Sequence, residues 1–245
     1  MELSYVLLVV FAATLIRSTF GFGEALVSVP LLALFIPITI ATPLASLLSV
    51  TIGGIVIIQD WRNVHVRSAS WLIGATVFGI PLGLLLLTSS HPISIKIILG
   101  LIILGFSLYS LVGAKRTILD RDSTPILLLC GFVAGVLGGA YGMNGPPLAI
   151  YGALRQWSAQ HFRATLQAYF LPASLIGVAG YWLTGLWTPT VTHYYLLSLP
   201  VALPAIFLVR FFNRRIAGDT FVKYVYIGLA GVGLLLLSEA LHNYL

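Results

Sequence analysis

Long apolar runs, separated by short polar or glycine-containing breaks, form the main pattern along the chain. A helix needs about 20 residues to cross the hydrocarbon layer of a membrane. Six runs are long enough, and they cover residues 39–58, 69–88, 93–112, 164–183, 190–212 and 221–241. The pattern therefore predicts an all-α polytopic membrane protein.

Four further apolar runs are shorter, and they lie in two pairs. The first pair covers residues 3–17 and 25–38, and the second covers 125–141 and 144–155. A glycine-containing interruption separates the members of each pair: FGFGEA at 20–25 and YGMNGP at 141–146. Each pair can form either a re-entrant hairpin or two spanning helices.

The order of these runs repeats. On either side of a polar linker at 115–124, the chain reads short, short, long, long, long. Gly21 aligns with Gly142, 121 positions later, and Gly23-Glu24 aligns with Asn144-Gly145. This layout indicates an internal duplication within a single membrane transport domain, with repeats at 1–114 and 125–245.

Basic residues predict how the two halves lie in the membrane, because loops rich in Lys and Arg stay in the cytoplasm. The connection after residue 58 carries Arg62 and Arg67, whereas its counterpart at 184–189 carries no Lys or Arg. The sparsely charged connection at 89–92 has the most basic connection, at 210–223, as its counterpart. The charge bias reverses between the halves, which predicts two inverted repeats with both termini outside.

The two glycine interruptions would then enter the membrane from opposite sides. Arms of about 12 to 15 residues rise roughly 18 to 22 Å, which is less than the hydrocarbon core of about 30 Å. Both turns can therefore lie near the midplane. There, the N-termini of the helices that start near 25 and 144 would present free N–H groups, which suits an anion. Pro146 fits the first turn of the second of these helices.

Other glycines are better explained by helix packing. Gly131, Gly135 and Gly139 recur every four residues, and Gly79 and Gly83 do the same on another predicted helix. Small residues at this spacing let two membrane helices approach closely.

Composition supports the membrane interpretation: 59% of the residues are hydrophobic and 8% are charged. The net charge of +6 is explained by basic cytoplasmic loops, so no nucleic-acid partner is predicted. The first apolar run has Glu2 and no basic leader, so it is not read as a secretory signal. With one cysteine and five scattered histidines, the sequence predicts neither a metal site nor a cofactor.

Several stretches resemble the signatures of the sulfite exporter TauE/SafE family. The first is Phe20–Leu32, a glycine-rich turn followed by Val29-Pro30-Leu31-Leu32. The second copy runs from Gly131 to Leu148, and Phe162–Thr165 resembles the Arg-Ala-Thr that follows it. Glu24 and Asn144 depart from the family pattern, which usually has glycine there. The resemblance implies transport of sulfite, of sulfonates such as sulfoacetate, or of related small sulfur-containing anions across the bacterial inner membrane.

Arg17 and Glu24 are the charged candidates for a substrate site, since charges inside a membrane are costly and usually paired or functional. The Arg17 guanidinium matches the forked oxygens of a sulfonate. The alternative is an ion pair with Glu24 across the turn. Glu24 is in turn a candidate to carry a coupling proton, and the alternative is a static partner of Arg17.

The remaining candidates are polar or main-chain groups. Asn144 and the N–H groups of Gly23 and Gly145 can hold substrate oxygens, although Asn144 is also a common turn former. Gly21 and Gly142 complete the two turns. Thr42 and Ser46 share one helix face, and Arg163 and Gln167 are their counterparts in the second half, so that the four can form two walls of one cavity. Interhelical hydrogen bonds and a loop-facing anchor are the alternative roles.

These features favour a secondary transporter for a small sulfur-containing anion, driven by protons or by voltage. A passive anion channel of the same architecture is the alternative. An enzyme is not predicted, because the intramembrane charges are too few to supply a nucleophile, a base and metal ligands. The lipid bilayer is the expected surrounding, and the sequence allows a homodimer.

Overall fold

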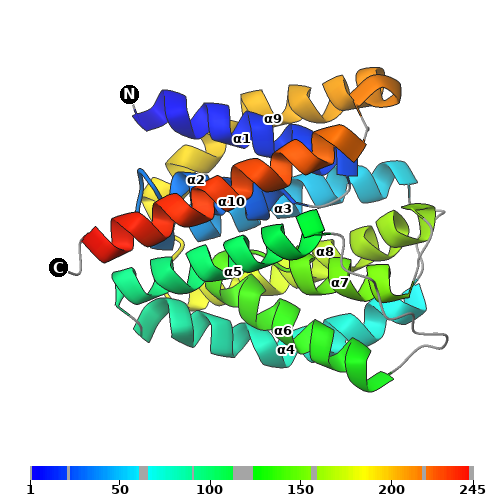
Figure 1. The fold of residues 1–245 in the computed structure, drawn as a ribbon, viewed down its shortest axis with the longest axis horizontal. Helices are drawn as coiled ribbons and strands as arrows, with labels where there is room; N and C mark the ends of the chain where they lie inside the picture. Colours follow the sequence, from blue (N-terminus) through cyan, green and yellow to red (C-terminus); the bar gives the residue numbers. More distant parts are fainter. Residues whose placement is uncertain are drawn as a thin grey trace.

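The computed structural model describes residues 2–20, 23–60, 66–89, 91–112, 124–155, 159–216 and 219–242, and in these parts every regular element is an α-helix (Figure 1). The helices are α1 (Glu2–Phe20), α2 (Glu24–Leu32), α3 (Ile38–Asp60), α4 (Val66–Ser89), α5 (Pro92–Val112), α6 (Thr124–Tyr141), α7 (Gly145–Leu154), α8 (Ala159–Leu183), α9 (Pro189–Ile216) and α10 (Asp219–His242). The all-α prediction is therefore confirmed. Gly21 and nearly all of the predicted linker at 115–124 lie outside the described residues.

In the part of the chain that the structure describes, five helices are long and apolar enough to cross a membrane, as expected for a multi-pass membrane protein. The apolar windows are Ile38–Ile55, Ser70–Ser89, Ile93–Val112, Thr124–Tyr141 and Pro189–Leu208. Two expected crossings, 164–183 and 221–241, have shorter apolar parts among the described residues, at Ala168–Leu183 and Tyr226–Ser238. Both lie within helices of 24 or 25 residues whose first turns are polar.

The two short pairs are asymmetric hairpins, each with a long first arm and a short second arm. α1 has 19 residues and α6 has 18, which is about 27 to 28 Å of helix. Of the two alternatives from the sequence, re-entrant or spanning, the segment at 125–141 is long enough for the spanning one. α2 has only 9 residues and α7 has 10. α2 ends at Leu32 rather than at 38, because residues 33–37 form a turn in which Phe35 and Ile36 donate to the Leu32 carbonyl.

The glycines of α4 and α6 let these two helices touch through their backbones, as the sequence predicts. A Cβ atom at Gly135 would lie 3.0 Å from the Cα of Gly79, and one at Gly139 would lie 3.1 Å from the Cα of Gly83. Nothing larger than hydrogen fits on these faces. α5 and α10 approach in the same way, because a Cβ at Gly100 would lie 3.1 Å from the Gly233 carbonyl oxygen.

The other principal contacts join α1 to α9 and α3 to α8, so each strongly packed pair links the first five helices to the last five. In Figure 1, α1 runs from left to right and α2 returns, while α6 runs from right to left and α7 returns. Both termini lie at the left end of the bundle. Eight of the nine residues of α2 are buried. The short arm α2 and residues 143–145 of the second turn therefore lie inside the protein and not at its surface.

Candidate functional site

An ion pair between Arg17 and Glu24 lies at the first turn. Arg17 belongs to the last turn of α1, and Glu24 is the first residue of α2. Gly23 between the two helices has φ 98°, a left-handed conformation that glycine adopts without strain. Arg17 Nη1 donates to Glu24 Oε2 at 2.8 Å, and the side chains are only 4% and 1% exposed. The ion-pair alternative from the sequence is therefore confirmed.

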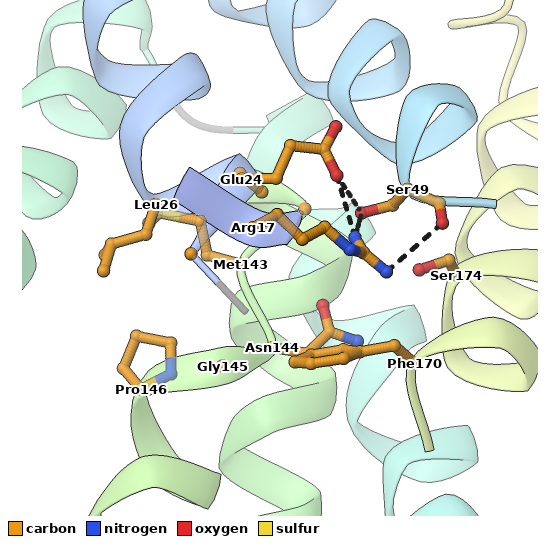
Figure 2. A pocket seen from close by; sticks show the side chains of 13 residues that line it. Arg17, Glu24, Leu26, Ser49, Met143, Asn144, Gly145, Pro146, Phe170 and Ser174 are labelled. Atoms are coloured by element: carbon orange, nitrogen blue, oxygen red, sulfur yellow. Dashed lines mark hydrogen bonds and ion pairs between the residues drawn. The ribbon is translucent and has the colours of Figure 1, made fainter. Parts of the chain in front are cut away.

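Ser49 on α3 holds this pair from the opposite side (Figure 2). Its hydroxyl donates to Glu24 Oε2 at 3.0 Å and accepts from Arg17 Nη1 at 2.5 Å. Arg17 Nη2 also reaches the Ser49 carbonyl oxygen, at 3.4 Å. Charge-assisted hydrogen bonds of this kind are stronger than neutral ones, and they fix the guanidinium between α1, α2 and α3.

Phe170 on α8 supports the other face of the guanidinium. Arg17 Cζ lies 5.3 Å from the centre of the Phe170 ring, within the range of a cation–π contact. Figure 2 shows Glu24 and Ser49 above the guanidinium, with Phe170 and Asn144 below it. The cation thus faces both halves of the chain.

A cavity of about 20 Å³ adjoins Arg17 and Glu24, and residues of both turns line it. The first turn contributes Gly23–Leu26 and the second contributes Gly142–Pro146, with Ser49, Phe170 and Ser174 completing the lining. This volume is enough for about one water molecule. The two interruptions, 121 positions apart in the sequence, therefore meet at one place.

The second turn is shaped by Gly142, which ends α6. It has φ 66°, and its N–H donates to the Gly138 carbonyl oxygen at 2.9 Å, a common way for a helix to end. A Cβ atom at this position would lie 2.9 Å from Ser46 Oγ. Glycine is therefore required both for the backbone conformation and for the close approach of α3.

Asn144 follows in this turn and is buried. Its side chain packs against Gly138, and its Nδ2 donates weakly to the Tyr169 hydroxyl at 3.5 Å. That hydroxyl is also 2.8 Å from Thr76 Oγ1, which donates to the Gly131 carbonyl oxygen. Asn144 is thus oriented by α8 and α4 and lines the cavity from the side of α7.

Two polar atoms of the ion pair have no partner in the part of the chain that the structure describes. They are Arg17 Nε and Glu24 Oε1, and both are buried. Buried polar atoms are almost always hydrogen-bonded to protein or water, so each unpaired one requires an explanation. Both belong to side chains that line the cavity. The ion pair therefore keeps one unused N–H donor and one unused carboxylate oxygen on side chains that line the cavity.

The structure describes the side chains of two of the four residues predicted to form walls of the cavity. Thr42 and Ser46 are buried on α3, but they lie beside Gly142 and are not part of the cavity lining. Arg163 and Gln167 belong to α8, and their side chains lie outside what the structure describes. The lining residue on α3 is Ser49, about one turn beyond Ser46.

Sequence reasoning missed Ser49, Phe170 and Ser174. A signal for Ser49 was present, since it continues the polar face of Thr42 and Ser46 by one turn. Phe170 stands 121 positions after Ser49, the same offset as between Gly21 and Gly142. Phe170 could not be recognised as a site residue from the sequence, because an aromatic side chain in an apolar helix is normally interpreted as part of the hydrophobic core.

Comparison with known proteins adds one match. A family model described as Sulfite exporter TauE/SafE matches residues 6–236 of the 245. No curated protein and no solved structure matches the chain. The match spans both turns, Arg17, Glu24 and Ser49, and the resemblance noted from the sequence motifs is confirmed.

Proposed function

The chain belongs to the sulfite exporter TauE/SafE family, and on this premise we propose that it is a secondary transporter in the bacterial inner membrane. It moves sulfite, a small organosulfonate or another sulfur oxyanion, with protons as the driving force. The anion binds where the two hairpin turns meet, near the middle of the membrane, in a conformation in which the cavity is wider than the 20 Å³ described above. Both termini lie outside the cell.

The buried Arg17 guanidinium on this cavity is the observation that carries the proposal. A cation inside a membrane is costly, and it is usually retained for function. A planar guanidinium can bind two oxygens of one anion through parallel N–H groups, which suits the oxygens of sulfite or of a sulfonate. Nε has no partner among the residues that the structure describes and Nη2 makes only a long bond of 3.4 Å, so this edge of the guanidinium can take such an anion.

Main-chain groups would support the same anion. α7 begins at Gly145, whose N–H has no partner within the helix, whereas the next two residues, Pro146 and Pro147, carry no N–H. A helix N-terminus also carries a partial positive charge. Gly145 and Asn144 both line the cavity opposite Arg17. An anion between Arg17 and these two residues would be held by the guanidinium charge of the first half of the chain and by amide groups of the second half.

An inverted repeat would let this site open to either side in turn. If α1–α5 correspond to α6–α10, the contact of α4 with α6 is the counterpart of the contact of α9 with α1, and both are among the most extensive in the bundle. The same correspondence pairs α5 with α10 and α3 with α8, so the repeat symmetry maps each of these two contacts onto itself. The opposed directions of the two hairpins agree with this symmetry (Figure 1). Alternating access in such folds arises when one repeat moves against the other.

Flux measurements with purified protein in liposomes test the proposal. With the membrane voltage held at zero by potassium and valinomycin, an imposed pH gradient should drive radiolabelled sulfite against its own gradient. A passive channel would only equilibrate the label, so equilibration without accumulation would favour the channel. Liposomes that contain the protein but show no more flux than empty ones would contradict both.

A further inference from the structure

We propose that each anion bound at Arg17 is singly charged and is accompanied by one proton that joins Glu24. This inference rests on the proposed function and specifies the charge of its substrate and the proton stoichiometry. It excludes doubly charged anions such as sulfate as good substrates, and it has sulfite bind in its singly protonated, singly charged form.

The guanidinium has two sides that are occupied differently. Nη1 is fully engaged by Glu24 Oε2 and Ser49 Oγ. Nε has no partner among the described residues, and Nη2 has only the long bond to the Ser49 carbonyl oxygen. Nε and Nη2 form one of the edges through which a guanidinium holds two oxygens of an anion. The anion can therefore bind while Glu24 remains on Nη1.

Charge balance then sets the protonation of Glu24. Arg17 and Glu24 are the only charged side chains among the described residues that line the cavity, and together they are neutral. A singly charged anion would leave a net charge of −1 in a buried site, which a low-dielectric surrounding opposes. One proton on Glu24 restores neutrality. With a doubly charged anion, the site would stay at −1 even after this proton is taken up.

The Glu24 carboxyl group has one oxygen atom that can take up this proton. Glu24 Oε2 accepts two hydrogen bonds, whereas Oε1 is buried and has no partner in the described chain. The groups that face Glu24 are Arg17 from α1 and Ser49 from α3, and no described charged side chain of α5 or α10 lines the cavity. The proton comes from water and bonds to Oε1. No bond of the anion is broken, so the step is a binding equilibrium in which one anion and one proton are taken up together.

Calorimetric titration with methanesulfonate tests this inference, because methanesulfonate keeps a single charge over the working pH range. Titrations at one pH in buffers of different ionisation enthalpy count the protons that enter with the ligand. We expect about one proton per anion for the wild-type protein, and an affinity that falls by up to tenfold per pH unit as Glu24 loses its proton. Sulfate should bind at least about tenfold more weakly than methanesulfonate.

Glu24→Gln provides the matched variant, since its amide resembles the protonated carboxyl in shape and charge. We expect it to bind methanesulfonate with no proton uptake and with an affinity independent of pH. Ser107→Ala, a change at a buried hydroxyl of α5 outside the cavity, should keep the wild-type proton count. If Glu24→Gln does not fold, the proton count of the wild-type protein decides alone.

Three results would overturn the inference: binding to the wild-type protein without proton uptake, a wild-type pH dependence in Glu24→Gln, or sulfate binding as tightly as methanesulfonate. Each of these would leave the proposed function standing. The proposed function itself fails if the folded wild-type protein binds neither methanesulfonate nor sulfite.

Discussion

The hydroxyl of Ser49 donates a 3.0 Å hydrogen bond to Glu24 Oε2, the same oxygen that binds Arg17. One side chain of α3 therefore joins a cation at the end of α1 to an anion at the start of α2. This bond fixes the tip of the first hairpin against α3, and it makes Ser49 the residue whose removal is most informative about the site.

Replacing Ser49 by Ala should destabilise the protein by about 1 to 3 kcal/mol, because a buried carboxylate oxygen loses a donor. Ser107→Ala is the matched control, since the Ser107 hydroxyl is equally buried but has no partner among the described residues. Unfolding in detergent by chemical denaturant measures both. Equal loss of stability in the two variants would show that the bond to Glu24 contributes nothing.

Gly142→Ala should destabilise the second turn by more than the strain of its backbone alone. A left-handed conformation costs a residue with a side chain about 1 to 2 kcal/mol, and here the new Cβ would also lie 2.9 Å from Ser46 Oγ. Gly185→Ala separates the two effects, because Gly185 has φ 73° and open space around it. Thermal unfolding should give the larger loss for Gly142→Ala, with partial recovery when Ser46 is changed to Gly.

Close packing of α4 on α6 predicts that Gly135→Ala is poorly tolerated. Its Cβ would lie 2.5 Å from the Thr76 carbonyl oxygen and 2.9 Å from the Thr76 Cα. The helices must separate, at a cost of about 1 to 3 kcal/mol. Gly74→Ala on α4 is the control, because nothing lies within 4 Å of its added Cβ. Melting temperatures in detergent should fall for Gly135→Ala and stay the same or rise for Gly74→Ala.

Much of this architecture could be predicted from the sequence. Hydropathy gave most helix ends to within a few residues, because glycine and proline mark the breaks. The meeting of the two turns followed from the repeated order of the runs and the reversed charge bias. The pair of Arg17 and Glu24 was foreseen as an alternative, since two opposite charges seven residues apart inside a membrane rarely remain separate.

The lining of the cavity could not be predicted to the same degree. Helices in a membrane are apolar on all sides, so the pattern does not show which face points inward. Ser46 and Ser49 lie on the same helix, and only the packing of α3 against α2 decides that Ser49 rather than Ser46 meets the ion pair. The end of α1 was underestimated for a related reason: the apolar run stops at Arg17, but the helix continues through the polar residues Ser18 and Thr19 to Phe20.

Ligand-dependent stability of the purified protein, compared between the wild type and Arg17→Lys, tests the central claim most directly. Lysine keeps the charge beside Glu24 but loses the two-pronged geometry. A saturating sulfur anion stabilises its native target by about 2.7 kcal/mol at 100 times the Kd. We expect sulfite or a C2 sulfonate to raise the melting temperature of the wild type and of Gly74→Ala, but not of Arg17→Lys. An equal shift in Arg17→Lys, or no shift in the wild type with sulfite, thiosulfate and C2 sulfonates, would contradict the account.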